Sequence, residues 1–464
     1  MRFALTAALM LMLCGSCAFA QGDDLPSAEE VEAAIITAAT AFSELSYQGA
    51  YPYLLSGDLQ TRYNCGHGNN SPFPDETYLC IEPPGTPWVG RAYLRAYRAT
   101  GDERLLQMAM EVGDALATIQ LAVGGWRMRQ PLSDEWADQE IPEEVTGAYQ
   151  RGAFADLDDS RSQGPARFFI ELVRDGSDTE RHREAVERAL QMLLDAQYPS
   201  GGWPQIYPAP ENEADYRRYH TLNDASMPNT MLVLLEAWRT FGEQEYLDAV
   251  VRGADWLLDV RLPGAAWAQQ YYDDFVTGPR KPNHPAPARW FEPIAITASE
   301  SGAAMNVLAE VWLETGDEKY IEPFDEIVAW YERSRLDDGR WARFYELHTN
   351  RPLYCTPERI ITHSDESLRP GYGWKGAYGN RVFTIAERVN TLGRDGILAE
   401  REAAPDAERI QQLGGAAAQA IDALDERGLW VSEHGPEDEN IRTGDFFNHM
   451  NTLSAYLEAV RGAD

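Results

Sequence analysis

The chain has 464 residues, with 74 Asp or Glu against 40 Lys or Arg, so its formal net charge at pH 7 is −34. So acidic a surface repels the phosphates of nucleic acids and the headgroups of anionic lipids. We therefore expect no nucleic acid and no membrane among its partners, and we expect the protein to be a monomer.

The N-terminus has the pattern of a secretory signal peptide. Arg2 provides a positive end, residues 3–13 form an apolar run, and residues 18–20 (Ala-Phe-Ala) suit a cleavage site. Attachment of a lipid at Cys17 is the less favoured alternative. The sequence therefore predicts a secreted or periplasmic protein.

Three cysteines remain after the expected cleavage, at positions 65, 80 and 355. Cys65 and Cys80 flank a loop rich in Gly, Asn and Pro, and in an oxidising compartment we favour a disulfide between them over free thiols. Cys355 then has no partner.

The chain reads as helical from Ser27, which can cap a helix whose apolar positions recur through residues 31–42. Residues 48–88 are rich in Tyr, Gly, Pro and Asn and show no period. We expect a long ordered loop there, held by the two cysteines and lying across the helices that follow.

From residue 91 a single unit recurs: two helices separated by a short break and closed by a turn that ends in Trp. A hairpin of this kind cannot bury both of its faces alone, so neighbouring hairpins must stack. The sequence predicts an all-α fold, an α/α toroid or incomplete α/α barrel of stacked helical hairpins with long aromatic-rich loops. The expected helices are 91–99 with 105–120, 167–173 with 184–197, 231–238 with 246–258, and 302–313 with 320–333.

This pattern divides the chain into three parts. We expect residues 1–20 to be the signal peptide and residues 21–88 to form an N-terminal helix and a long loop that pack on the toroid. Residues 89–464 would then form the α/α-toroid catalytic domain.

The closing tryptophans stand at positions 126, 203, 267, 341 and 430. In a toroid the loops that carry them converge on one central cleft. We interpret Trp126 and Trp430 as plugs at the ends of hairpins. Trp203, Trp267 and Trp341 are followed by polar or charged residues, which favours loops that face a ligand.

Residues 196–230 place an aromatic platform and a carboxylate at one end of a hairpin. Trp203 and Tyr207 follow a helix and a Pro-Ser-Gly-Gly turn, and Asn223-Asp224 stands at the start of the next apolar helix. A Gly-Gly-Trp turn alone is more typical of a core tryptophan. The functional interpretation therefore depends on the residues around it.

Motifs for nucleotide binding, thiol redox chemistry, zinc hydrolysis and the common serine hydrolases are absent from the sequence. Carboxylates, arginines and aromatic residues remain as carriers of chemistry. The acidic candidates at the ends of the repeat loops are Asp224, Asp273, Asp274 and Glu292.

Basic residues gather in residues 333–381, where nine Lys or Arg stand against six Asp or Glu. Arginines that alternate with aromatic rings suit an acidic sugar polymer, because guanidinium groups pair with carboxylates while rings stack on sugar faces. The residues concerned are Trp341, Arg343, Tyr345, Arg351, Arg369, Tyr372 and Lys375.

Five motifs in order make the sequence similar to the pectate lyases of polysaccharide lyase family 10, over about residues 185 to 380. Their order along the chain makes the resemblance more specific than any one of them. They are GGWPQIYP at 201–208, TLND at 221–224 with Met227, WAQQY at 267–271, ARWFEP at 288–293 with SES at 299–301, and WARFYE at 341–346 with NRP at 350–352.

The resemblance implies an α/α toroid that cleaves polygalacturonate by anti-β-elimination with calcium. Removal of the C5 proton builds negative charge on the adjacent uronate carboxylate, which Ca²⁺ and an arginine can stabilise. Calcium prefers oxygen ligands, and the candidates are Asp224, Asp273 and Glu292.

In the family an arginine is the base that removes this proton. The motifs point to Arg343 first and to Arg351 second. Because a guanidinium is normally protonated, this role requires an alkaline optimum or an unusual cationic neighbourhood.

The remaining site residues are expected to bind the polymer. They are Trp203, Tyr207, Asn223, Trp267, Arg289, Trp341, Tyr345, Arg369, Tyr372 and Lys375.

The chain departs from the family at Ala225, where the family commonly has a second aspartate, and at Pro370. Loss of a carboxylate would weaken calcium binding, shift the uronate preference, or mark a protein that binds without cleaving. Two alternatives stay open: a glycoside hydrolase on a similar barrel that uses two of Asp224, Asp273 and Glu292 as acid and base, and a non-catalytic acidic-polysaccharide-binding protein.

Overall fold

The computed structural model describes most of the chain, and the expected signal peptide lies outside the described residues. These are residues 25–63, 65, 72, 77–132, 154–177, 179–264 and 266–462.

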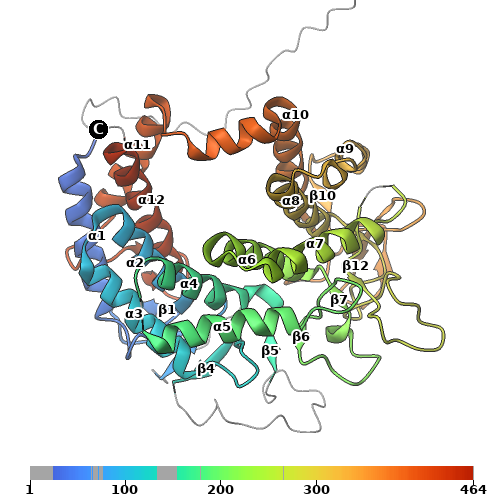
Figure 1. Ribbon diagram of the computed structural model, residues 1–464, viewed down its shortest axis with the longest axis horizontal. Coiled ribbons are helices and arrows are strands. Elements are labelled where there is room, and N and C mark those ends of the chain that lie inside the picture. Colours follow the sequence, from blue (N-terminus) through green and yellow to red (C-terminus); the bar gives the residue numbers. More distant parts are fainter. Residues whose placement is uncertain are drawn as a thin grey trace, which may run out of the picture.

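The described chain is dominated by helices that follow one another round a ring (Figure 1). The inner helices α2, α4, α6, α8 and α10 pack in succession, α12 packs on α2, and each outer helix packs against the inner helix that follows it. The predicted α/α toroid is confirmed. The helices are α1 Ala28–Ser43, α2 Thr86–Thr100, α3 Glu103–Thr118, α4 Gln163–Arg174, α5 Glu180–Asp195, α6 Ser226–Phe241, α7 Gln244–Asp259, α8 Ala298–Thr315, α9 Phe324–Arg333, α10 Gly379–Glu402, α11 Ala407–Asp422 and α12 Thr443–Arg461.

The breaks between paired helices follow from a recurrent Thr-Gly-Asp sequence. Gly101 ends α2 with φ of 74°, and Gly316 ends α8 with φ of 72°. This left-handed conformation favours glycine. The next residue, Asp102 or Asp317, then caps the helix that follows by accepting a backbone N–H.

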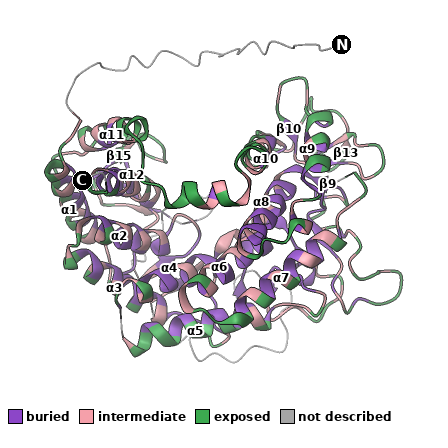
Figure 2. Cartoon of the chain, turned by 45° about the horizontal axis from the view of Figure 1, so that its top comes forward, coloured by how far each residue is buried: buried purple, intermediate pink, exposed green. Residues whose placement is uncertain are grey.

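Buried residues, purple in Figure 2, lie where neighbouring helices face one another. The second half of α10, beyond the non-helical Gly393, and α11 bury fewer residues than the other helices. No helix among the described residues has the length and apolarity needed to cross a bilayer.

Short strands and single 3-10 turns, which periodicity does not reveal, position the loops at the ends of the helices. Phe344 pairs with Thr297, and Ala342 pairs with Lys375, so the loop around residue 343 is fixed on both sides. The strands are β1 Leu54–Ser56, β2 Arg62–Tyr63, β3 Tyr78–Cys80, β4 Arg129–Pro131, β5 Ala155–Asp156, β6 Ile206–Tyr207, β7 His220–Thr221, β8 Gln270–Tyr271, β9 Ile296–Thr297, β10 Trp341–Ala342, β11 Phe344–Tyr345, β12 Pro352–Cys355, β13 Ile361–Thr362, β14 Lys375–Gly376, β15 Val431–Ser432 and β16 Asn440–Arg442.

The 3-10 turns are η2 Asp158–Ser160, η3 Tyr216–Arg218, η4 Asn223–Ala225 and η5 Glu318–Tyr320. Two of them, η2 and η4, immediately precede the inner helices α4 and α6 and lie in contact with each other.

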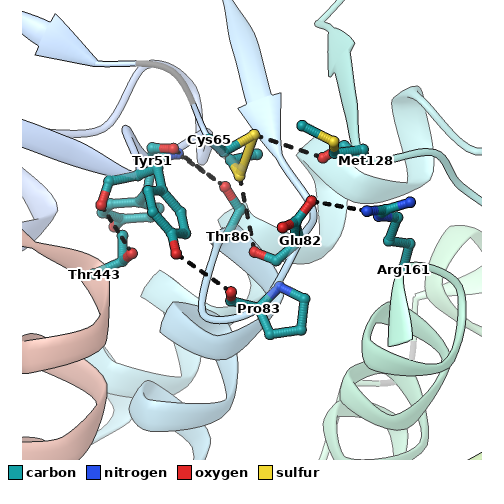
Figure 3. Close-up of a disulfide and its surroundings, with 10 residues drawn as sticks. Tyr51, Cys65, Glu82, Pro83, Thr86, Met128, Arg161 and Thr443 are labelled. Atoms are coloured by element: carbon teal, nitrogen blue, oxygen red, sulfur yellow. Dashed lines mark hydrogen bonds and ion pairs between the residues drawn. A yellow bond between two sulfur atoms is a disulfide. The ribbon is translucent and has the colours of Figure 1, made fainter. Parts of the chain in front are cut away.

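The N-terminal segment packs on the rest of the ring. Helix α1 packs against α2, α11 and α12, and β1 pairs with β16 near the C-terminus. The predicted disulfide between Cys65 and Cys80 is confirmed, with Cα atoms 5.9 Å apart, and Cys355 is a buried free thiol. Figure 3 shows this disulfide beside Met128, with Glu82 reaching Arg161.

All five hairpin tryptophans are buried, and this corrects the prediction for three of them. Each indole N–H donates to a carbonyl in the last turn of the preceding outer helix, where helix carbonyls lack partners within the helix. Trp203, Trp267 and Trp341 therefore plug hairpin ends, as Trp126 and Trp430 do, and do not face a ligand. The bonds run from Trp126 to Leu116 (2.9 Å), Trp203 to Leu193 (2.7 Å), Trp267 to Leu257 (2.7 Å), Trp341 to Tyr331 (2.7 Å) and Trp430 to Ala420 (2.8 Å).

Tyr345 is also a core residue, not the ligand contact that the sequence predicts, with an exposed fraction of 1%. Its hydroxyl accepts from the backbone N–H of Ala342 at 2.9 Å and donates to the carbonyl of Ser334 at 2.6 Å. Both hydrogen-bonding roles of the hydroxyl are therefore used within the fold.

Candidate active site

Two turns with the same backbone conformation face each other at the starts of α4 and α6. Asp159 has φ of 47° and ψ of 30°, and Asp224 has φ of 47° and ψ of 33°. The residues that follow, Ser160 and Ala225, both have φ of 58°. Non-glycine residues adopt this left-handed conformation at a cost, and such residues concentrate at functional sites.

The two turns bring three carboxylates together. One oxygen each from Asp158, Asp159 and Asp224 lies within 4.8 Å of the other two. Asn223 joins the turns, because its Nδ2 donates to Asp158 Oδ1 at 3.1 Å and to Asp224 Oδ2 at 2.7 Å. Its Oδ1 is buried and has no hydrogen-bond partner among the described residues.

The carboxylates of this cluster repel one another. Burial, and then the charges of Asp156 and Asp159, raise the pKa of Asp158 well above its ordinary value. A bound cation would relieve this repulsion. The oxygen donors of the cluster are of the type that calcium prefers.

A buried arginine lies beside the cluster and links it to the N-terminal segment. Arg161 Nη1 lies 2.7 Å from Asp156, and Nη2 lies 2.9 Å from Asp159 and 3.0 Å from Glu82. Burial alone would lower the pKa of Arg161, but the surrounding carboxylates raise it above its ordinary value. Arg161 therefore stays charged.

A second arginine, Arg343, contacts the cluster at Asp224. Arg343 Nη2 lies 3.1 Å from Asp224 and 2.6 Å from the fully buried Glu300. Its Cζ lies 5.0 Å from the centroid of the Tyr372 ring. The backbone N–H of Arg343 donates to the carbonyl of Trp374 at 2.8 Å, which fixes the loop.

Arg343 is held protonated in this arrangement. Burial would lower its pKa, but Glu300, Tyr372 and Asp224 together raise it strongly above the ordinary value. A general base needs a neutral guanidinium, and the surroundings favour the opposite state. Arg351, the second predicted base, is exposed in the turn between β11 and β12.

Two of the three predicted calcium ligands lie outside the carboxylate cluster, and the structure corrects them. Asp273 is fully buried and accepts from Arg218 Nε at 2.8 Å and Nη2 at 2.9 Å. Glu292 accepts from Arg289 Nε at 2.8 Å and from the Tyr372 hydroxyl at 2.8 Å. Because these donors occupy their oxygens, both carboxylates are structural partners of arginines.

Asp158 and Asp159 are the carboxylates that sequence reasoning missed. The sequence does contain a signal for them, because Leu157-Asp158-Asp159-Ser160 resembles Leu222-Asn223-Asp224-Ala225 position by position. Both segments stand just before an inner helix. Glu300, which pairs with Arg343, stands in the SES motif, but the motif alone does not indicate this role.

The other predicted polymer-binding residues lie in different surroundings. Arg289 is 41% exposed at its side chain and is paired with Glu292. Lys375 forms ion pairs with Asp338 and Asp365. Tyr207 is partly buried in β6, Arg369 and Tyr372 are partly exposed, and Asn223 is buried between the two turns.

A family model described as pectic acid lyase matches residues 120–240 and 337–383. These stretches contain η2, η4 and the loop of Arg343. The resemblance to the pectic acid lyases is thereby confirmed. The protein is a pectate lyase-like enzyme, of the carbon–oxygen lyases that act on polysaccharides. No curated protein is significantly similar to it in sequence.

Solved structures are similar to this chain at low identity, and those with a TM-score of 0.50 or more share its α/α toroid. A D-mannose isomerase is 11% identical over 93% of this chain and 98% of its own, with a TM-score of 0.51. A family 76 mannosidase from Bacteroides thetaiotaomicron is 12% identical over 94% and 99%, with a TM-score of 0.50. A family 10 polysaccharide lyase from Cellvibrio cellulosa is 20% identical over 65% and 97%, with a TM-score of 0.47.

Proposed function

We propose that this protein cleaves polygalacturonate by calcium-assisted β-elimination, with the cation held by Asp158, Asp159 and Asp224. The observation that supports the proposal is the cluster of three carboxylates beside a protonated arginine, Arg343. A cation held by the carboxylate cluster and the guanidinium of Arg343 could each bind the carboxylate of an acidic polymer.

The residues present fit calcium. The three carboxylates offer hard oxygen ligands, and the unpartnered Oδ1 of Asn223 lies on the side chain that joins two of them. Calcium bound there would supply a positive charge that pairs with the uronate carboxylate and stabilises the negative charge formed on it. The ion would also offset the burial and the mutual repulsion that together raise the pKa of Asp158.

Arg343 would bind the same carboxylate of the substrate. With its guanidinium held by Asp224 and Glu300, it is oriented before the substrate arrives, and little reorganisation is needed. We propose charge stabilisation as its role. The base role that the resemblance assigns to Arg343 first and Arg351 second needs a neutral guanidinium, which this arrangement opposes at Arg343.

Location and assembly belong to the same proposal. We propose that the protein acts outside the cytoplasm as a monomer on an acidic polysaccharide. The disulfide between Cys65 and Cys80 supports an oxidising compartment.

The products test the reaction. Incubation with polygalacturonate and calcium should produce unsaturated uronate ends, which absorb in the ultraviolet, and excess chelator should abolish the signal. New reducing ends without this absorbance would identify a glycoside hydrolase. Binding of the polymer with neither product would identify a non-catalytic polysaccharide-binding protein.

A further inference from the structure

Trp290 is a large aromatic side chain that the fold leaves nearly half exposed, with an exposed fraction of 48%. Two guanidinium groups lie against its ring. Arg359 Cζ is 4.9 Å and Arg369 Cζ is 5.6 Å from the ring centroid. Arg369 also lies 4.2 Å from the ring of Phe291.

Three separate segments converge to build this surface. Trp290 lies between β8 and β9, and Arg359 lies in the turn between β12 and β13. Arg369 is fixed by its backbone, because its N–H donates to the carbonyl of Cys355 at 2.8 Å and its carbonyl accepts from Trp374 Nε1 at 2.8 Å.

The two arginines differ from the other basic residues near the candidate site. Arg289, Arg343 and Lys375 each form an ion pair with a carboxylate. Within the described part of the chain, no carboxylate forms an ion pair with Arg359 or Arg369. In a protein with a net charge of −34, two such cations beside an exposed indole ring leave a local positive charge that an anionic ligand can neutralise.

The surface is continuous with the candidate active site. The ring centroids of Trp290 and Phe291 are 5.1 Å apart, and those of Phe291 and Tyr372 are 5.0 Å apart. Tyr372 in turn lies against Arg343. A row of adjoining rings therefore leads from the protonated arginine to the exposed tryptophan.

We propose that Trp290, Arg359 and Arg369 form an outer subsite that binds one acidic sugar residue of the polymer. The indole ring would contact the apolar face of the sugar, and a guanidinium would pair with its carboxylate. This inference rests on the proposed function and extends it. The protein should prefer long uronate chains that reach both the carboxylate cluster and this subsite.

Binding of oligogalacturonates of defined length tests the subsite. In rapid-mixing binding experiments with calcium present, read before turnover, the wild-type protein should bind the hexamer more tightly than the trimer. Trp290→Ala should lower the hexamer affinity about fivefold, the size expected for the loss of one aromatic contact, and should bring the hexamer and trimer affinities closer together. Arg359→Gln should also lower the hexamer affinity.

Phe275→Ala is the matched control, because Phe275 is a 57% exposed aromatic residue that packs on Tyr198 instead. It should bind both oligomers as the wild-type protein does. If Trp290→Ala retains the full hexamer affinity, the subsite is wrong although the proposed function stands. If the wild-type protein binds no oligogalacturonate at all, the uronate assignment and the subsite both fail.

Discussion

Asp159 and Asp224 have the same backbone conformation in two turns that face each other, with φ of 47° at both positions. Each turn precedes an inner helix, and Asn223 joins them by donating to Asp158, 65 residues earlier in the chain. A repeat of the helical hairpin has thus placed equivalent carboxylates opposite one another. The cation site that we propose would follow from the stacking of two copies of one local structure.

Substitution at either turn should weaken cation binding. Asp159→Asn and Asp224→Asn each remove one charged ligand, so the affinity for Ca²⁺ or the luminescent analogue Tb³⁺ should fall about tenfold or more. Tb³⁺ luminescence titration measures this without any substrate. Asp255→Asn, at a partly exposed residue of α7 paired with Lys319, should bind as the wild-type protein does. Equal affinities in all four proteins would exclude the carboxylate cluster as the cation site.

Ala225 stands where a further carboxylate is expected in the family, and restoring it should tighten cation binding. Aspartate tolerates positive φ better than alanine, so the φ of 58° at this position does not oppose the change. Ala225→Asp should raise the Tb³⁺ affinity and make the melting temperature respond more strongly to calcium. Ala225→Asn has the same shape without the charge. If the asparagine variant gains as much affinity, the effect does not come from ligand charge.

The helical ring could be predicted from the sequence, because each hairpin carries two amphipathic helices and a recurrent Gly-Asp break. The two-residue strands could not, since alternation needs more residues to be visible. Pairs such as Phe344 with Thr297 and Ala342 with Lys375 depend on loops that meet only in the folded chain. These same pairs position Arg343.

The tryptophans show why the sequence alone does not predict the ligand contacts correctly. Polar residues after Trp203, Trp267 and Trp341 suggested exposed loops, but each indole N–H completes the last turn of an outer helix. The sequence does not show that a carbonyl in the last helical turn lacks a partner, nor that the indole N–H of the following tryptophan reaches it. Of the three clustered carboxylates the sequence predicts only Asp224, because Asp158 and Asp159 become candidate ligands only when η2 lies against η4.

Removal of Arg343 alone should affect folding as well as catalysis. Glu300 is fully buried, and Arg343→Gln would leave its charge without a partner, which costs about 3–5 kcal/mol. The double variant Arg343→Gln/Glu300→Gln should recover most of the stability in urea unfolding while turnover of polygalacturonate stays absent. If the double variant regains activity, Arg343 acts through the fold and not on the substrate.

Glu310 should make stability depend on pH in the acid range. Burial raises its pKa, but Arg401 and Arg239 lower it further, to a net value below the ordinary 4.5. Because the folded pKa is the lower one, the stabilisation is complete above the unfolded pKa and is lost as pH falls through the folded pKa. Glu310→Gln should destabilise the protein by about 1 kcal/mol at pH 7. The difference in urea midpoints should shrink as the pH falls below 4.5, and a constant difference would contradict this origin.

The N-terminal segment should influence the carboxylate cluster through Glu82. Arg161 Nη2 donates hydrogen bonds to both Glu82, at 3.0 Å, and Asp159, at 2.9 Å. Without the charge of Glu82, Arg161 pairs more fully with Asp159 and competes with a cation for the same carboxylate. Glu82→Gln should therefore lower the Tb³⁺ affinity, by several-fold, without removing any cation ligand.

The disulfide gives an independent test of the same coupling. Cys80 stands two residues before Glu82, so reduction of its bond to Cys65 should loosen this segment and lower the Tb³⁺ affinity in the same direction. Glu437→Gln is the matched control, because Glu437 accepts a hydrogen bond from Tyr63 of the same segment and forms no bond with Arg161. It should leave the affinity unchanged. If Glu82→Gln and the reduced protein both bind Tb³⁺ as tightly as the oxidised wild type, Arg161 does not compete with the cation.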